Sequence, residues 1–228
     1  MATLKVNNLS YRTLLHQTSV SFSHGTLYAI IGPNGAGKST FLKAVAKIIT
    51  PSSGEVLWNE ENLHSCCRQH ISKIISLVPQ NPTVSFDFST YDLVAMGRYP
   101  HNDKIVRTDI IRKAMETVDA WKFRHRTITE LSRGEQQRIY IARALVTESP
   151  VILLDEPMTA LDINHQLTLW NLLQELARQG KIVAAVVHDL EMAKRFCQEA
   201  IVFSKGRSIS HGPASETITT TLINTVFV

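Results

Sequence analysis

The sequence predicts an α/β fold in which a core sheet with its helices is interrupted by an inserted helical subdomain. Short apolar runs at 27–31, 151–154 and 182–187 have the length and composition of buried strands. The segment from about 85 to 146 shows mostly helical periodicity instead. Together these two observations indicate an α/β core with a helical insertion.

The first half of the core begins with the strand at 27–31, which ends in a glycine-rich turn. A helix is expected next, because apolar residues recur at helical spacing: Phe41, Ala44, Val45, Ile48 and Ile49. The segment 50–54 contains proline and glycine and ends that helix. Short strands are expected around 56–58 and 74–78.

Apolar periodicity also predicts the helices and strands of the insertion and of the second half of the core. One apolar helical face in the insertion consists of Ile110, Ile111, Ala114, Met115 and Val118. A helix after 151–154 has an apolar side made of Leu169, Trp170, Leu173, Leu176 and Ala177. Asp189 is expected to cap the helix that follows the strand at 182–187. The segment 201–209 predicts a closing hairpin.

Length and composition favour one domain. The chain has 228 residues, 44% of them hydrophobic, which is enough for one large α/β domain with a packed core. It shows no internal repeat and no low-complexity stretch. We expect a single domain over 1–228, with its core at 1–84 and 147–228 and the helical subdomain at about 85–146. No regulatory tail is expected, because the chain stops at Val228, soon after the fold closes.

Charge and cysteine content exclude several classes. The net charge of +4 is modest and the chain has no long Lys/Arg run, so no nucleic-acid partner is expected. That charge suits an anionic membrane surface or an ordinary soluble one. Cys66, Cys67 and Cys197 are odd in number, which argues against a disulfide framework. His64 and His70 lie near the first two, but the spacing matches no standard zinc pattern, so no metal site is predicted there.

No membrane segment is expected. The first ten residues lack the apolar stretch of a secretory signal. No apolar run approaches the ~20 residues that a membrane span requires. The sequence therefore predicts a soluble chain that would act at a membrane only through a partner.

A phosphate-binding loop follows the first strand. It matches G-x-x-x-x-G-K-[ST] over Gly32, Pro33, Asn34, Gly35, Ala36, Gly37, Lys38, Ser39 and Thr40. Its glycines let successive N–H groups point at phosphate oxygens, and the helix that starts near Lys38 adds its positive end. Lys38 is expected to reach the β- and γ-phosphates of ATP, and the Ser39 hydroxyl to ligate Mg²⁺. This is the P-loop of nucleoside triphosphatases.

Two carboxylates follow the strand at 151–154. Ligands of open α/β sheets bind at the carboxyl ends of the strands, which is where Asp155 and Glu156 emerge. Asp155 is expected to bind Mg²⁺, directly or through water. Glu156 is expected to orient the attacking water or accept its proton. The pair alone is a weak signal, and the upstream P-loop gives it meaning.

A second candidate anion site lies at the start of a predicted helix. Ser132, Arg133, Gly134 and Glu135 open an amphipathic stretch that runs through Val146. A helix start offers N–H donors and a positive end to an anion. Alone, the segment would be an ordinary N-cap with a turn glycine.

These motifs, in this order, resemble the ATP-binding cassette (ABC) ATPases over about residues 4–212. The resemblance implies a P-loop NTPase (RecA-like) core with a mixed sheet and an inserted helical subdomain. In that family the signature segment, here Ser132 to Glu135, covers the γ-phosphate held by a second copy. Two copies therefore close head to tail around two ATP molecules.

The same resemblance assigns further residues. Tyr11 matches the aromatic that stacks on adenine. Gln80 is similar to the Q-loop glutamine, which touches Mg²⁺ and the water. Asp162 lies in a segment similar to the D-loop at the dimer interface, and His188 is similar to the switch histidine that contacts the γ-phosphate. The implied catalytic set is Glu156, His188, Lys38 and Gln80, with Ser39, Gln80 and Asp155 at the metal.

Arg133 departs from the family pattern, which usually has glycine there. If the position required a positive φ, arginine would strain it by ~1–2 kcal/mol. On that premise we expect a working but slower ATPase, in which Arg133→Gly holds or raises turnover.

Three segments resemble importers of iron chelates, heme and cobalamin: 92–101, 135–138 and 161–166. The last two favour the heme branch, with ferric siderophore, cobalamin or a metal ion as alternatives. Gly97 and Pro100 are expected to bend a loop on which Arg98 and Tyr99 grip a permease helix. The implied partners are a second copy, a polytopic permease and, indirectly, an extracytoplasmic substrate-binding protein, with the chain peripheral on the cytoplasmic face of the inner membrane.

The chain differs from two other classes of nucleotide-binding protein. A soluble cassette ATPase of DNA repair or translation would need a long coiled-coil insertion or two cassettes in one chain. A non-hydrolysing regulator would not need Lys38, Asp155, Glu156 and His188 together.

Overall fold

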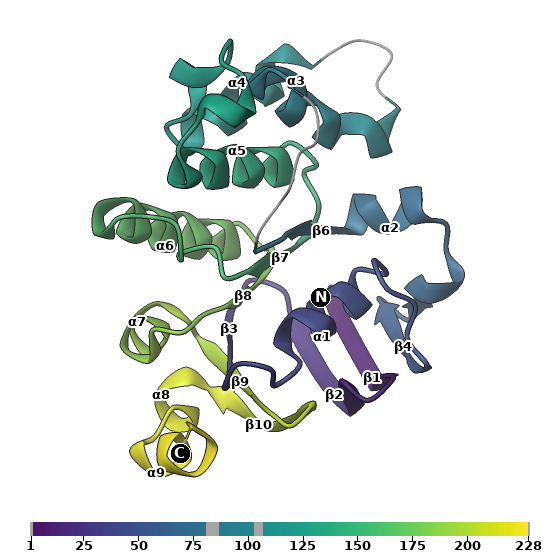
Figure 1. Cartoon of the computed structure of the whole chain (residues 1–228). Helices are drawn as coiled ribbons and strands as arrows, with labels where there is room; N and C mark the ends of the chain where they lie inside the picture. The colour runs from purple at the N-terminus through teal and green to yellow at the C-terminus, as the bar shows by residue number, and fades with distance from the viewer. Residues whose placement is uncertain (1, 81–86, 103–106, 228) are drawn as a thin grey trace.

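A mixed six-stranded sheet forms the centre of the computed structural model, which describes residues 2–80, 87–102 and 107–227. Its strand order is β10-β9-β3-β8-β7-β6 (Figure 1). The strands are β3 (Leu27–Ile31), β6 (Ile75–Val78), β7 (Val151–Asp155), β8 (Ile182–Val186), β9 (Glu199–Ser204) and β10 (Arg207–Pro213). All neighbours pair in parallel except β9 and β10, which form an antiparallel hairpin. The predicted mixed sheet and closing hairpin are confirmed.

An antiparallel sheet with the order β2-β1-β4-β5 packs beside the central sheet. Its strands are β1 (Thr3–Tyr11), β2 (Leu15–Ser23), β4 (Ser53–Trp58) and β5 (Glu61–Asn62). Sequence reasoning did not predict β1 and β2. They alternate buried and more exposed residues instead of forming continuous apolar runs, as expected of a sheet with one solvated face.

Helices cover the central sheet and fill the insertion (Figure 1). The α-helices are α1 (Lys38–Val45), α2 (Arg68–Ile74), α3 (Thr90–Ala95), α4 (Thr108–Thr117), α5 (Arg133–Leu145), α6 (Ile163–Arg178), α7 (Leu190–Phe196), α8 (Ala214–Thr217) and α9 (Thr220–Phe227). Short 3-10 turns are η1 (Leu63–Ser65), η2 (Met96–His101), η3 (Trp121–Phe123) and η4 (Ile128–Glu130). The sequence did not predict α2, α8 and α9.

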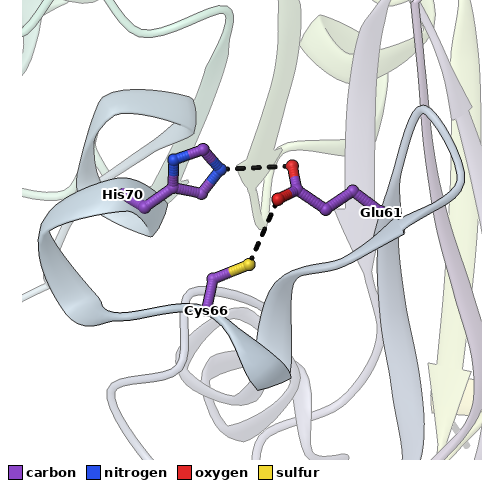
Figure 2. Close-up of side chains that lie close together, drawn as sticks. All are labelled: Glu61, Cys66 and His70. Atoms are coloured by element: carbon purple, nitrogen blue, oxygen red, sulfur yellow. Dashed lines mark hydrogen bonds and ion pairs between the residues drawn. The ribbon is translucent and has the colours of Figure 1, made fainter.

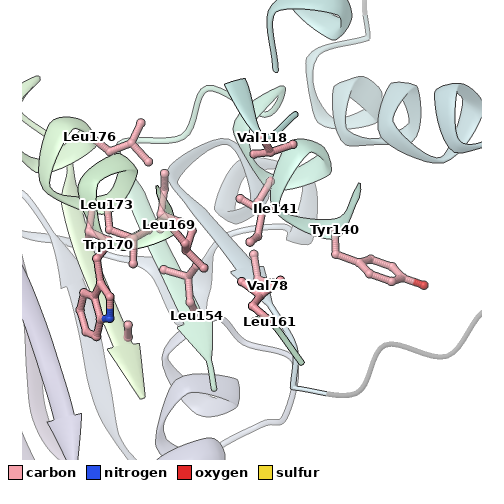
Figure 3. Close-up of a cluster of buried hydrophobic side chains, with 14 of the residues drawn as sticks. Val78, Val118, Tyr140, Ile141, Leu154, Leu161, Leu169, Trp170, Leu173 and Leu176 are labelled. Atoms are coloured by element: carbon pink, nitrogen blue, oxygen red, sulfur yellow. The ribbon is translucent and has the colours of Figure 1, made fainter. Parts of the chain in front are cut away.

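Two apolar cores lie on opposite faces of the central sheet. Along β3, Leu27, Ala29 and Ile31 belong to one core, and Tyr28 and Ile30 belong to the other. The first core joins the sheet to α6, α7 and the insertion, and Figure 3 shows part of it around Trp170 and Leu173. The second joins the sheet to α1 and the antiparallel sheet. Because neighbouring side chains of a strand point to opposite faces, β3 is held from both sides.

The insertion lies between β6 and β7 and runs from α3 to α5. Polar contacts connect its parts: Thr90 Oγ1 donates to the Phe123 carbonyl at 2.6 Å in a buried hydrogen bond, and Arg138 Nη1 lies 3.0 Å from the exposed Asp119 Oδ2. The expected helical character of this segment is confirmed. The expected boundary between residues 84 and 85 lies outside the described residues.

The helix after the P-loop is shorter than predicted. It ends at Val45, and Ile48 and Ile49 follow in a turn. Lys47 has φ 53°, a left-handed conformation that closes the helix, and the Ile48 N–H donates to the Lys43 carbonyl at 2.9 Å. Ile48 is 61% exposed, so its apolar side chain belongs to the surface rather than to the helix core. None of the helices within the described residues has the length and hydrophobicity of a bilayer span.

Candidate functional site: a phosphate-loop cavity and a separate helix tip

The P-loop joins the buried strand β3 to α1, as the sequence predicts. Gly37 is the N-cap of α1 with φ 96°, and a Cβ there would lie 2.7 Å from the Leu14 carbonyl oxygen. Real Cβ atoms do not approach a carbonyl so closely, and left-handed φ values favour glycine. The loop therefore needs glycine at this point both for its turn and for its contact with the antiparallel sheet.

The loop borders a cavity of about 590 Å³. Residues 34–40 line it together with Leu14, Gln80, Glu156 and His188. The structure thus brings together the predicted loop, the predicted base Glu156, and the Gln80 and His188 to which the resemblance assigns roles, although they are distant in sequence. Leu14, which is 51% exposed, is a lining residue that sequence reasoning missed.

Lys38 is buried beneath the loop. Its ammonium donates to the carbonyl oxygens of Gly32 at 2.6 Å and Pro33 at 2.9 Å. Burial lowers the pKa of Lys38, although the nearby carboxylates Glu156 and Asp155 act in the opposite direction. Burial therefore destabilises the charged ammonium of Lys38. The negative oxygens of a bound phosphate would stabilise it.

Asp155, at the end of β7, is only 3% exposed. It accepts a hydrogen bond from Ser39 Oγ at 2.9 Å. Burial raises the pKa of the Asp155 carboxyl, and the Ser39 hydrogen bond partly offsets this. A buried carboxylate beside a positively charged partner would be easier to keep ionised, so the site favours a cation.

The donors fit Mg²⁺. Neighbouring ligands of an octahedral Mg²⁺ ion at 2.0–2.1 Å lie about 2.9 Å apart, the separation of Ser39 Oγ and Asp155 Oδ1. The Gln80 amide nitrogen donates to Glu156, which leaves the Gln80 amide oxygen for the cation. Hydroxyl, carboxylate and amide oxygens are the hard donors that Mg²⁺ prefers.

Glu156 is held by several neighbours at once. His188 Nε2 lies 2.9 Å from its Oε1, and Gln80 Nε2 donates to its Oε2 at 2.7 Å. Thr159 Oγ1 donates to the same Oε2 at a longer 3.4 Å. Glu156 has φ 51°, a left-handed conformation that costs a side-chain-bearing residue about 1–2 kcal/mol. Strain of this kind, with a fixed carboxylate, is typical of a functional position.

Tyr11 ends β1 and is half-buried, with the Arg12 guanidinium carbon 5.2 Å from its ring centre. It is not among the described residues that line the loop cavity, whereas Leu14 is. The Leu14 N–H donates to the Tyr11 carbonyl at 3.0 Å, so the two lie on one turn. The stacking role of Tyr11 stays a prediction.

The second candidate site lies at the tip of α5. Ser132 is the N-cap and forms a capping box with Glu135: its Oγ accepts from the Glu135 N–H at 3.4 Å, and its N–H donates to Glu135 Oε2 at 2.8 Å. The Ser132 hydroxyl also donates to that carboxylate oxygen at 2.8 Å. The two hydrogen bonds that Ser132 donates lower the pKa of the Glu135 carboxyl.

The prediction that Arg133 strains the backbone is wrong. Arg133 is the first residue of α5 and is absent from the described residues with positive φ. Ordinary helical geometry accepts arginine without penalty, so the premise for a slower ATPase is removed. Its side chain is exposed.

Gly134 has a packing role. A Cβ at this position would lie 2.9 Å from the Ala160 carbonyl oxygen, in the turn before α6. Asp162 caps α6 in that turn, accepting from the His165 N–H at 3.0 Å, and its Oδ2 lies 2.7 Å from His165 Nδ1. Ser132, Arg133, Gly134, Asp162 and His165 are among the residues around one cavity of about 440 Å³. The structure therefore brings the predicted signature and D-loop segments together.

Ala160 and His165 lie in segments that the sequence marks by resemblance, 159–162 and 161–166, but their places beside the α5 tip were not predicted. An Asp three residues before a His at a helix start is a common capping pattern, which gave no reason to expect His165 at this cavity. The contact between Gly134 and Ala160 joins segments 26 residues apart and has no local signal.

A third cavity, of about 540 Å³, lies between the core and the insertion. Ile48, Ser72, Met96 and Tyr140 contribute to its lining. Tyr99 nearby is 82% exposed, as expected for a residue available to a partner. The expectation for Arg98 is wrong: it donates to the Val146 carbonyl at 2.9 Å and to Glu148 Oε2 at 2.7 Å. The carbonyls at the end of α5 and an acidic side chain draw this guanidinium inward.

Together the fold and the loop cavity define a nucleotide-binding domain of the P-loop class. The comparison with known families then places it further: residues 15–159 match the ABC transporter family. That match covers more than half of the chain. The chain belongs to the ABC transporter family, as an ATP-binding domain.

Relatives with established names support this placement. One relative is the cobalamin import ATP-binding protein BtuD of Halobacterium salinarum, which is 38% identical to this chain over 218 residues. The aligned region covers 94% of this chain and 55% of the length of BtuD. This chain thus spans about half the length of that relative. Hemin import ATP-binding protein HmuV of Rhodopseudomonas palustris (strain HaA2) is 37% identical over 94% of this chain and 85% of its own. Ferric enterobactin transport ATP-binding protein FepC of Escherichia coli is 36% identical over 94% of this chain and 82% of its own.

Solved structures share the fold. CbiO1 from Clostridium perfringens, part of the ABC transporter complex cbiONQ, superposes with a TM-score of 0.81 at 27% identity, over 96% of this chain and 92% of its own. A dimeric ATP-binding cassette in a post-hydrolysis state with ADP and Pi superposes with a TM-score of 0.83 at 24% identity, over 92% of this chain and 98% of its own. The predicted ABC ATPase fold is confirmed.

Proposed function

We propose that this chain hydrolyses MgATP as a head-to-tail dimer and drives an importer of iron chelates, heme or cobalamin. The observation that carries the proposal is the position of Glu156: its carboxylate lines the P-loop cavity and is fixed by His188 at 2.9 Å and Gln80 at 2.7 Å. A fixed carboxylate beside a phosphate cradle is what activation of a water molecule requires.

The chemistry follows from the side chains. The P-loop N–H groups and Lys38 would hold the β- and γ-phosphates, and Ser39, Asp155 and Gln80 would hold Mg²⁺, which would neutralise charge on the phosphate oxygens. Glu156 orients a water toward the γ-phosphorus and takes its proton. The bond from water oxygen to phosphorus forms as the bond to ADP breaks, which gives ADP and inorganic phosphate. His188 keeps the Glu156 carboxylate in place and is positioned to contact the γ-phosphate.

A second copy completes the site. Among the described residues, the P-loop cavity and the cavity at the α5 tip share no lining residue. One chain therefore does not bring Ser132 to its own Lys38, whereas two chains arranged head to tail can bring each α5 tip to the other's loop. The N–H groups of Arg133 and Gly134 at that tip suit the γ-phosphate.

The membrane partner would dock on the surface around Ile48, Met96 and Tyr99, which are 61%, 38% and 82% exposed. This surface borders the cavity between core and insertion, so a permease helix seated there would follow motion of the helical subdomain (about 85–146) against the core. The chain would be peripheral on the cytoplasmic face of the inner membrane, with an extracytoplasmic substrate-binding protein delivering cargo. Opening and closing of the dimer would then be passed to the permease.

The cargo proposed here is heme, with ferric siderophore, cobalamin or a metal ion as alternatives. Named relatives at 36–38% identity import cobalamin, hemin and ferric enterobactin, which supports the class without separating its members. The segments 135–138 and 161–166 favour the heme branch. Uptake of labelled cargo by a strain deleted for this chain would distinguish these compounds.

Dimer formation can be tested directly. Glu156→Gln keeps the shape of the side chain and should slow hydrolysis by about 10²–10⁴-fold. With MgATP it should accumulate as a dimer with two nucleotides, measured by light scattering coupled to size exclusion. Adding Gly134→Asp should abolish the dimer, because it places a negative charge at the α5 tip and its Cβ presses on the Ala160 carbonyl there, while each chain still binds ATP. Asn224→Asp on α9 adds the same charge at an exposed position and should leave the dimer intact. A dimer that survives Gly134→Asp would refute the shared site.

A further inference from the structure

Glu61, Cys66 and His70 form a compact cluster outside the nucleotide site (Figure 2). They come from β5, the residue after η1, and α2. His70 Nε2 lies 3.1 Å from Glu61 Oε2, and Cys66 Sγ donates to Glu61 Oε1 at 3.4 Å. One ligand atom from each residue lies within 4.8 Å of the other two. The side chains of His70 and Glu61 are 43% and 49% exposed, so an ion from solution can reach them.

The cluster differs from the one that the sequence suggests. His64 turns away, with Nε2 3.1 Å from the Ala44 carbonyl on α1, and Cys67 is the exposed N-cap of α2. Glu61 takes their place, because η1 folds the chain back and brings β5 beside the first turn of α2. The nearest alternative explanation for the cluster is an ordinary hydrogen-bonded surface group.

Hydrogen bonds from Lys47 and packing of Leu63 fix the backbone that carries the cluster. The Lys47 ammonium donates to the carbonyls of His64 at 2.7 Å and Cys66 at 2.9 Å. Asn62 accepts a hydrogen bond from the His64 N–H at 2.9 Å, and Leu63 is fully buried. The three donor side chains are thus presented by a fixed loop, which lowers the conformational entropy lost when an ion binds.

The donor set selects the kind of ion. Sulfur and imidazole nitrogen favour zinc and similar borderline-soft ions, whereas Mg²⁺ and Ca²⁺ prefer oxygen donors alone. A tetrahedral zinc ion with bonds of 2.0–2.3 Å separates neighbouring donors by about 3.2–3.6 Å. His70 Nε2 and Cys66 Sγ approach different oxygens of Glu61, at 3.1 Å and 3.4 Å, and one donor atom from each residue lies within 4.8 Å of the other two. The side chains would therefore have to draw closer together around a single ion.

From this geometry we infer that Glu61, Cys66 and His70 bind a zinc-class divalent transition-metal ion, with the fourth position open to water. Binding releases the thiol proton of Cys66 to solvent and leaves a thiolate on the metal. The ion would join β5 to α2. Gln69 of α2 donates to the Pro100 carbonyl at 3.0 Å, so the metal would also steady the side of the molecule where the insertion meets the core.

Metal binding to the full chain tests this inference. The reduced protein, purified without a histidine tag, is titrated with Co²⁺ and then with Zn²⁺ against a chelating dye. We expect one ion per chain and a thiolate-to-cobalt charge-transfer band that Zn²⁺ abolishes. Cys66→Ser should remove the band and weaken Zn²⁺ binding at least tenfold, and His70→Ala and Glu61→Gln should weaken it as well. Cys67→Ser, the matched control one residue away, should leave both unchanged.

Two further measurements separate a specific site from casual binding. Amide hydrogen exchange within α2 should slow when Zn²⁺ is added to the wild type and stay unchanged in Cys66→Ser. MgATP binding, measured in parallel, should be the same in all variants, which also shows that each is folded. Metal binding without the thiolate band, or with equal affinity in wild type and Cys66→Ser, would overturn the inference and leave the ATPase proposal untouched.

Discussion

His188 Nε2 lies 2.9 Å from Glu156 Oε1, although the two residues follow different strands of the central sheet. The parallel pairing of β7 with β8 brings their carboxyl ends to one edge, where both side chains enter the P-loop cavity. The contact gives the imidazole a defined place beside the carboxylate.

Replacing His188 should slow chemistry without preventing binding. We expect His188→Ala to lower the rate of phosphate release by about 10²-fold, because Glu156 loses a partner that orients it. ATP affinity, measured with a fluorescent analogue, should change little. His211→Ala is a matched control: its Nε2 lies 3.0 Å from Glu199 Oε2 on the β9–β10 hairpin, another histidine–carboxylate pair. Equal losses in both variants would contradict the role assigned to His188.

Asp155→Asn should stabilise the nucleotide-free protein. Burial raises the pKa of Asp155, so the folded chain binds this proton more tightly than the unfolded chain does. Stability is therefore lost as pH rises from the ordinary aspartate value of about 4 toward the raised value, and the loss persists at neutral pH. The variant should melt at a higher temperature than wild type at pH 7, with a difference that shrinks in acid, and should lose Mg²⁺-dependent ATP binding.

Asp119→Asn should change the melting temperature in the opposite direction and serves as a control. The pKa of Asp119 is lowered, first by the hydrogen bond from Lys122 and also by Arg138. Its contribution to stability is present above the ordinary aspartate pKa and is lost as pH falls through the lowered value. Asp119→Asn should therefore lower the melting temperature at pH 7 and lose its effect in strong acid. If Asp155→Asn also destabilised at pH 7, the burial argument would be wrong.

Arg133→Gly should weaken the ATP-dependent dimer. A cation at the N-terminus of α5 is unfavourable for the helix itself but favourable for an arriving γ-phosphate, and it balances the Glu135 carboxylate. We expect about tenfold weaker dimerisation in the Glu156→Gln background, or about 1.4 kcal/mol. Arg133→Lys should restore most of the affinity, and added salt should narrow the difference. Tighter dimerisation of Arg133→Gly would show that Arg133 hinders closure.

Tyr99→Ala should affect assembly alone. Its side chain is 82% exposed, so its removal should change the free energy of unfolding by no more than about ±0.5 kcal/mol, as ordinary surface substitutions do. The melting temperature and the basal ATPase rate should therefore stay close to those of the wild type. Copurification with a membrane permease should fall. Ile209→Ala, on β10 and 49% exposed, removes a comparable apolar side chain elsewhere and should copurify normally. Normal assembly of Tyr99→Ala would move the proposed docking surface away from η2.

The parts of this molecule that the sequence predicts best are local. The P-loop needs only a strand, a fixed run of glycines and a helix, and its residues lie together in both sequence and space. The capping of α7 by Asp189, which accepts from the Met192 N–H at 3.0 Å, is local in the same way. Such features are predictable because their physical cause lies within a few residues.

Other parts depend on tertiary packing. The half-buried strands β1 and β2 were not predicted, because only the antiparallel sheet determines which of their residues are covered. Arg98 is drawn inward by carbonyls at the end of α5, which are 48 residues away in sequence. The cluster of Glu61 with His70 requires the turn at η1. Family resemblance supplied Gln80 and His188, whereas Leu14 had neither a local pattern nor a resemblance to mark it.

The double anchoring of β3 has a consequence for how this protein responds to heat. The strand that ends in the P-loop packs against two separate apolar layers. Loosening of either layer should therefore disturb the conformation of the P-loop. Warming should therefore erode ATP affinity below the temperature at which the chain loses its secondary structure. Substitutions far from the nucleotide, on either side of the sheet, should produce temperature-sensitive transport before they produce insoluble protein.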